Sequence, residues 1–178
     1  AWLACTSSVS APTITDNDGN TWTAVFNQTH SSGARGVLYT AENITTGSAH
    51  VVSSPAVGNS PSIYLAFFSG HRIAGMTDQS NYSTGTSASP QPGSVTPGEG
   101  NCLVLTMTST FAGTPAPTVN GSYTYDSYYC NQGGNHLGGG LGRIIQTSAT
   151  ATNPTWTLGN SAGHVTAILS FLPQLAGN

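Results

Sequence analysis

Apolar and polar residues alternate along most of this chain, in short runs separated by Gly, Pro, Asn and Ser. A period of two residues is typical of β-strands with one face against a core, and the separating residues are typical of turns. We find no segment with a helical period of 3.6 residues and helix caps. The pattern predicts an almost entirely β chain, with strands at residues 1–6, 12–15, 21–26, 36–41, 50–53, 62–69, 102–108, 118–125, 142–147, 155–158 and 165–171.

Many short strands within 178 residues favour two packed antiparallel sheets. We therefore expect a single domain over residues 1–178, an all-β antiparallel sandwich of jelly-roll-like type with little or no helix. The run 62–69 is apolar on both faces, which predicts a central strand of this sandwich. The predicted core is aromatic and consists of Trp22, Tyr39, Phe67, Trp156 and Phe171.

Some segments interrupt the alternation. Residues 75–100 hold many Ser, Thr, Gly and Pro, which indicates a long ordered loop or two short edge segments. The Gly-rich segment 131–142 indicates a break between strands. Residues 16–20 (DNDGN) predict a turn in which Gly19 takes a positive φ. A further turn at 43–48 predicts that the strands on either side of it pair with each other.

Charge is scarce in this chain, which has three Arg, no Lys, and six Asp and Glu. Soluble domains usually carry about a quarter charged residues, and charge keeps free surfaces apart. A surface of Ser, Thr, Asn and Gly instead favours a built object such as a fibre, coat or shell. The net charge of −3 gives no reason to expect nucleic-acid binding, and no apolar run is long enough to span a membrane.

Six motifs follow one another in an order that resembles a known β-sandwich module. They are residues 14–23 (ITDNDGNTWT, like VTDxxGNTWT), 38–43 (LYTAEN, like YYAxN), 61–70 (PSIYLAFFSG, like SIxxAxFSG), 92–97 (PGSVTP), 145–156 (IQTSATATNPTW) and 167–171 (AILSF, like AxIxxF). The resemblance is to modules of uncharacterised tailed-phage virion proteins and of large secreted bacterial proteins.

This resemblance implies a structural role rather than an enzymatic one, and it transfers no functional residue. It also implies a strand segment before the equivalent of Ala1. We therefore expect a first strand that begins midway, so that a partner or a missing segment completes its sheet edge. Because Trp2, Leu3 and Cys5 place apolar side chains there, we predict an assembly contact at these three residues.

The densest group of aromatic and polar residues is the best candidate for a binding site. Sugars are bound by flat aromatic faces together with amide and carboxylate groups. The predicted glycan-binding residues are Tyr123, Tyr125, Asp126, Tyr128, Tyr129, Asn131, Gln132 and Asn135. The alternative is that Tyr123 and Tyr125 lie on one strand face as core or rim and that the rest is a loop.

A calcium site is the second candidate. Asp16, Asp18 and Asn20 alternate around Gly19, like the start of a calcium-binding loop. The glycine comes one position too early for an EF-hand, and no Glu closes a loop of twelve residues. A hairpin turn explains the same residues. The sequence therefore predicts no cofactor, with calcium as the one alternative.

The remaining reactive residues form no recognisable motif. The histidines show neither HxH nor HExxH spacing, and no GxSxG nucleophile motif is present. Cys5, Cys102 and Cys130 allow one disulfide of undetermined pairing or none. The sequence thus gives no catalytic residue.

Taken together, the sequence predicts a non-enzymatic structural or assembly protein of a phage virion surface or of an extracellular filament. Its expected partners are copies of itself and other virion or surface proteins, and its expected location is the virion or the cell surface. A carbohydrate-binding or adhesion module that recognises a cell-surface glycan is the alternative. A secreted enzyme is the third hypothesis.

Overall fold

The computed structural model describes residues 1–6, 13–54, 62–72, 75–111, 116–132 and 135–175. All strand pairs within it are antiparallel, and no helix occurs among these residues. The predicted all-β, two-sheet class is therefore confirmed. In the described part of the chain there is accordingly no helix that is long and apolar enough to cross a membrane.

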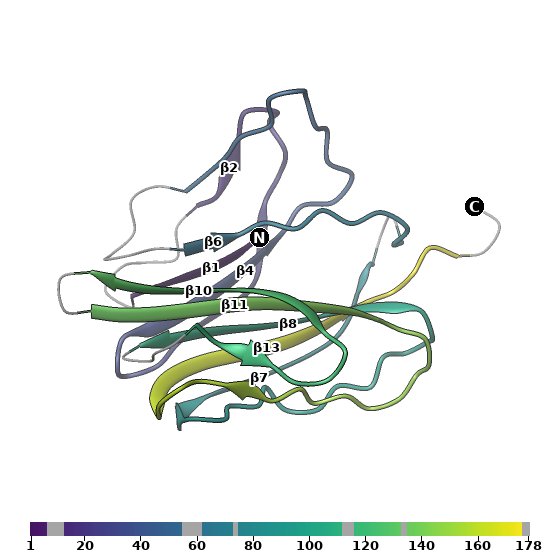
Figure 1. Cartoon of the computed structure of the whole chain (residues 1–178). Helices are drawn as coiled ribbons and strands as arrows, with labels where there is room; N and C mark the ends of the chain where they lie inside the picture. Colours follow the sequence, from purple (N-terminus) through teal and green to yellow (C-terminus); the bar gives the residue numbers. More distant parts are fainter. Residues whose placement is uncertain (7–12, 55–61, 73–74, 112–115, 133–134, 176–178) are drawn as a thin grey trace.

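Two larger sheets build the sandwich (Figure 1). The four-stranded sheet has the order β3 (Thr23–Thr29), β4 (Ala34–Thr40), β1 (Trp2–Thr6), β6 (Ser62–Tyr64). The five-stranded sheet has the order β10 (Thr124–Gln132), β11 (Asn135–Gln146), β8 (Cys102–Phe111), β13 (Ala162–Phe171), β7 (Thr77–Ser87). Two small sheets pair β2 (Thr15–Asp16) with β5 (Val52–Ser53), and β9 (Thr118–Val119) with β12 (Trp156–Thr157).

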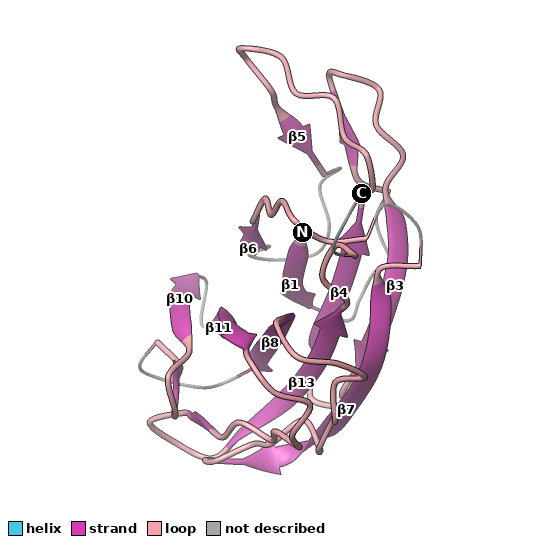
Figure 2. Cartoon of the chain, turned by 90° about the vertical axis from the view of Figure 1, so that its right-hand side faces the viewer, coloured by secondary structure: helices cyan, strands magenta, loops and turns pink. Residues whose placement is uncertain are grey.

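The two larger sheets face each other (Figure 2), and side-chain contacts connect them at both edges. At one edge, the Phe26 ring of β3 packs edge-on against the Tyr82 ring of β7, with ring centroids 5.5 Å apart. At the other edge, the Tyr64 hydroxyl of β6 donates a 2.8 Å hydrogen bond to the Gly139 carbonyl of β11. β6 and β10 are the outermost strands on this second side.

Alternation within the strands builds the core between the sheets. β4 contributes Ala34 and Leu38, and the other sheet contributes alternate residues such as Leu105 and Met107 of β8. All ten residues of β13 are buried, because loops also cover the outer face of the five-stranded sheet. There, one apolar cluster includes Val95, Val104 and Ile168, and another includes Val119, Trp156 and Leu158.

The predicted core is confirmed for three of its five aromatic residues. Trp156, Tyr39 and Phe171 are buried, with 0%, 4% and 5% of their surface exposed. Trp22 is half-buried against the Ile14, Val37 and Tyr39 cluster. Phe67 is 53% exposed, so the prediction for this residue was wrong.

The run 62–69 was predicted as a central strand, and that prediction was wrong as well. Only Ser62–Tyr64 forms a strand, at the edge of the four-stranded sheet. The even-numbered residues of the run, Tyr64, Ala66 and Phe68, pack against the core as expected. Its odd-numbered face is exposed, because no described element covers it.

Two segments that interrupt the alternation contain strands: 75–100, predicted as a long ordered loop or two short edge segments, and 131–142, predicted as a break between strands. Within 75–100, β7 is an eleven-residue edge strand of mainly polar residues that pairs with β13 along its length. The Gly-rich segment falls within the β10–β11 hairpin, where Gly138, Gly140 and Gly142 leave room for side chains above them. An added Cβ at Gly140 would lie 2.6 Å from the Trp156 ring.

Pairings around the first sheet also differ from the prediction. The strand at 36–41 does not pair with residues 50–53, because β4 pairs with β3 and β1 while β5 pairs with β2. The segment 118–125 is divided between β9 and β10. Gly19 has φ +73°, which confirms the predicted turn conformation.

Candidate functional site

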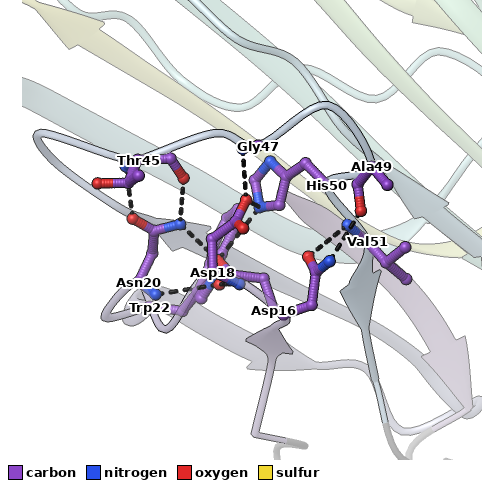
Figure 3. A network of polar contacts seen from close by, with 10 residues as sticks. Asp16, Asp18, Asn20, Trp22, Thr45, Gly47, Ala49, His50 and Val51 are labelled. Carbon is purple, nitrogen blue, oxygen red and sulfur yellow. Dashed lines mark hydrogen bonds and ion pairs between the residues drawn. The ribbon is translucent and has the colours of Figure 1, made fainter.

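Asp16, Asp18 and Asn20 converge as their spacing predicted, in a network that joins residues 16–22 to residues 45–51 (Figure 3). The Asp16 carboxylate accepts hydrogen bonds from the backbone N–H groups of Asp18 and Asn20, both at 3.0 Å. It also accepts from the Asn20 amide at 3.0 Å and the Trp22 indole N–H at 2.7 Å.

The same residues hold the second loop in place. Asn20 bonds to the backbone of Thr45 in both directions, and Asp18 accepts from the Gly47 N–H at 2.9 Å. The His50 Nε2 atom lies 3.4 Å from Asp16 Oδ2 and 3.9 Å from Asp18 Oδ2. The network therefore connects two loops that are distant in sequence.

The electrostatics of Asp16 follow from these contacts. Its side chain is fully shielded from solvent. Desolvation alone would raise its pKa, but the Asn20 backbone, Trp22, the Asn20 side chain and His50 together hold the pKa well below its usual range. Asp16 is thus an ionised, fully hydrogen-bonded group in the fold.

This environment suits a structural role better than calcium binding. Calcium needs oxygen ligands with free lone pairs, whereas N–H donors surround the Asp16 carboxylate. Across the described residues, no three His, Cys, Asp or Glu side chains form a group that could hold a metal ion. The geometry favours the hairpin-turn interpretation of Asp16, Asp18 and Asn20.

The predicted glycan-binding residues do not form one patch where the structure describes their side chains. Tyr125 of β10 lies opposite Gly142, on the outer face, and its ring packs edge-on against the Trp156 ring at 6.3 Å. Tyr123 is half-buried near the same face, with its hydroxyl 3.2 Å from Thr152 Oγ1. Asp126 lies opposite the core residue Leu141, on the inner face.

Tyr128 shares that inner face with Asp126, which contacts Arg143 at 3.5 Å. Successive residues of a strand point to opposite faces, so the strand divides a group that is dense in sequence. The single-patch interpretation of Tyr123, Tyr125, Asp126 and Tyr128 is therefore corrected. The side chains of Tyr129, Asn131, Gln132 and Asn135 lie outside the described part of the structure.

The predicted assembly contact depended on an unpaired edge at the first strand. β1 instead lies inside its sheet and pairs with β4 on one side and with β6 on the other. The edge argument for Trp2, Leu3 and Cys5 is therefore wrong, and their side chains lie outside the described residues. Among the described strands, the edges of this sheet are β6 and β3.

The histidine and cysteine environments give no support to catalysis. His30 and His164 contact hydroxyl groups of Ser32 and Thr166, whereas the carboxylate contacts belong to His50. Cys102 is a free, buried thiol, and burial raises its pKa, which makes it a poor nucleophile. The side chains of Cys5 and Cys130 lie outside the described structure.

A row of exposed apolar side chains is the feature that sequence reasoning missed. Ile63, Leu65 and Phe67 are 38%, 43% and 53% exposed on the outer face of the run 62–69. The Phe67 ring lies 5.7 Å from the His50 ring, so the row adjoins the Asp16 network. The signal was present, because a run that is apolar on both faces requires cover on both faces.

Behind this row lies a cleft of about 360 Å³ between the two large sheets. It is lined by core side chains from both sheets, by Tyr64 and by residues 66–70. Burial raises the pKa of Tyr64, which lines the cleft, with smaller contributions from Tyr128 and Asp126. The Tyr64 hydroxyl therefore stays neutral and donates to Gly139.

Comparisons with known proteins add no assignment. No protein-family model matches the chain, and no significant match occurs among curated proteins or solved structures. Function must therefore be argued from the row at residues 63–67, the cleft and the loop network.

Proposed function

We propose that this chain is a non-enzymatic structural module of a phage virion surface or of an extracellular filament, and that it packs against copies of itself. The virion or extracellular setting is inferred from the sequence resemblance. The observation that carries the assembly role is the exposed apolar row of Ile63, Leu65 and Phe67 at an open sheet edge.

This edge lacks the features that normally prevent strands from associating. Natural edge strands are usually protected by Lys, Pro, inward-pointing charge or a bulge. Residues 62–69 (SIYLAFFS) contain neither a charged residue nor a proline. In the described structure, β6 has a strand partner only on the β1 side. A neighbouring subunit can pair with the other side and cover the apolar row.

The composition removes the usual electrostatic obstacle to such packing. With three basic and six acidic residues in 178, few like charges meet when two copies approach each other. Hydrophobic burial is then opposed mainly by the entropy of association. Such an interface should persist in high salt, because it does not depend on ion pairs.

The test is to measure the mass of wild type and of Leu65→Lys by analytical ultracentrifugation over a range of protein concentrations. We expect wild type to form multimers and Leu65→Lys to associate at least roughly tenfold more weakly, because a charge in the exposed apolar row, one residue beyond β6, opposes burial of that row against a second copy. Val25→Lys is the matched control, since Val25 is 39% exposed on β3, at the opposite edge of the same sheet.

A wild-type protein that stays monomeric at high concentration contradicts the proposal. Equal weakening by the Leu65 and Val25 substitutions also contradicts it, because the effect would then be one of general solubility. If Leu65→Lys is monomeric and correctly folded, a glycan array on this variant tests the carbohydrate-binding alternative separately from assembly.

A further inference from the structure

The core between the two large sheets is hollow at one end. Leu38 of β4, Leu105 of β8, Leu141 of β11 and Phe171 of β13 all line the same cleft of about 360 Å³. Protein interiors are close-packed, with few voids larger than a water molecule. A space of this size falls within the range of small-molecule sites, which are concave and mostly apolar.

Hydrogen bonds hold the chain segment that closes the cleft at both of its ends. At one end, the Tyr64 hydroxyl donates to the Gly139 carbonyl at 2.8 Å. At the other end, the Gly70 carbonyl accepts from the Gln174 N–H at 2.7 Å. Between these points, Ala66 and Phe68 face the cleft and pack against the core. The cleft is thus a built feature of the sandwich edge.

The polar groups of the lining are few, and they include His71 and the Ala1 amino group, whose pKa is lowered to about 5 by burial. The lining contains no Asp, Glu, Lys or Arg among the described residues. Asn43 and Ser69 line it and are exposed, which places them where the cleft opens to solvent. Within the described structure neither side chain makes a hydrogen bond, so both can bond to a ligand. Asn43 has φ +51°, a left-handed conformation that Asn tolerates well.

We propose that this cleft binds a neutral amphiphile, whose apolar body lies between Phe68, Leu105 and Phe171 and whose uncharged hydroxyl, ester or amide end bonds to Asn43 and Ser69. A charged ligand is disfavoured, because the lining offers no opposite charge to offset desolvation. Phe67 belongs both to the exposed row and to the lining, whereas Leu65, whose substitution tests assembly, does not line the cleft, so the two proposals can be tested separately.

The test uses N-phenyl-1-naphthylamine, a neutral probe that fluoresces in apolar sites, and competitors of one chain length. We expect 1-decanol to displace the probe at a concentration at least tenfold lower than decanoate or decyltrimethylammonium. Absence of probe binding, or equal displacement by the three competitors, would overturn the proposal.

Two substitutions locate the binding. Ala66→Leu should fill the cleft and abolish probe binding, whereas Ala24→Leu, at an exposed position of β3, should leave binding unchanged. Asn43→Gly suits the positive φ, so the fold is retained. It should weaken displacement by 1-decanol several-fold without changing the affinity of the probe. Wild-type behaviour of both cleft variants would contradict the proposed site.

The same titration on Leu65→Lys separates a ligand from a partner subunit. Probe binding that is equal in wild type and in Leu65→Lys supports a small-molecule site. Binding that occurs only in Leu65→Lys contradicts the proposal, because a neighbouring copy would then fill the cleft in the assembled protein.

Discussion

At the scale of single residues, the fit between Gly140 and Trp156 is a close contact that the sequence could not reveal. The Trp156 ring is fully buried, and its indole N–H donates to Thr106 Oγ1 at 3.0 Å. An added Cβ at Gly140 would lie 2.6 Å from that ring. We expect Gly140→Ala to destabilise the protein by about 1–3 kcal/mol through overpacking, as measured by denaturant unfolding.

A graded control is available in the same strand. At Gly142 an added Cβ would lie 3.1 Å from a Thr106 methyl group, which is a milder overlap, so Gly142→Ala should cost less. In a double-mutant cycle, Trp156→Leu should remove most of the additional cost of Gly140→Ala. Independent effects of the two substitutions would show that the strain does not arise at the indole ring.

The glycines of β11 explain why the sequence predicted a break between strands where a strand lies. A Gly-rich stretch predicts a turn, because composition alone cannot distinguish backbone freedom from the need for space. In β11 the glycines at 138, 140 and 142 serve the second purpose, for side chains that arrive from other strands. Local spacing did predict the convergence of Asp16, Asp18 and Asn20, because their hydrogen bonds close within one turn.

At the scale of elements, the strength of the apolar pattern did not predict the length of the strand. Residues 62–69 had the strongest apolar pattern and yet lie at an edge, whereas the polar β7 is a long strand. Pairing of β7 with β13 uses backbone groups that any residue supplies, so a polar strand leaves no periodic signal. The cleft was equally unpredictable, since several distant strands form it.

The loop network makes a prediction at this scale. Asp16→Asn removes the charge, and with the amide nitrogen in the place of Oδ2 it leaves the Asn20 side-chain amide and the Trp22 indole N–H without their acceptor. We expect faster hydrogen exchange of residues 16–22 and 45–51, with β8 and β13 unchanged. The measurement is hydrogen–deuterium exchange with mass spectrometry at neutral pH.

Trp22→Phe provides the comparison for this experiment. It removes one donor to Asp16 and keeps an aromatic ring at a half-buried position, so the effect should have the same location and a smaller size. Uniform acceleration over the whole chain in both variants would show that the network supports the entire sandwich and not only the two loops.

At the scale of the whole molecule, scarce charge makes acid unfolding depend on a few buried groups. Full protonation leaves only three Arg and five His side chains with positive charge, so general repulsion is weak. His164 is 4% exposed in β13, and Thr166 Oγ1 lies 3.1 Å from its Nδ1 atom. Burial, with a smaller contribution from His30, lowers the pKa of His164 to about 4.

The sign of the resulting pH dependence follows from linkage. In the unfolded chain His164 takes up a proton near its ordinary pKa of about 6.5, whereas in the folded protein it does so only near 4. Stability is therefore complete above about pH 6.5 and falls as the pH decreases toward 4, by on the order of 3 kcal/mol. Asp16 affects stability at lower pH than His164. Because its pKa is depressed in the folded protein, the stability that its ionised form provides is lost as the pH falls below the ordinary pKa of an Asp side chain.

Urea unfolding at closely spaced pH values between 7 and 3 should resolve these two steps. His164→Asn can keep a polar contact with Thr166 and cannot take up a proton, so it should flatten the curve between pH 6.5 and 4. Asp16→Asn should leave that interval unchanged and reduce the slope below it. His71→Asn, at a half-buried position outside the β13 core, serves as the histidine control. If His164→Asn retains the wild-type slope, His164 is not the group that couples folding to pH, because a buried neutral imidazole must lose stability on protonation.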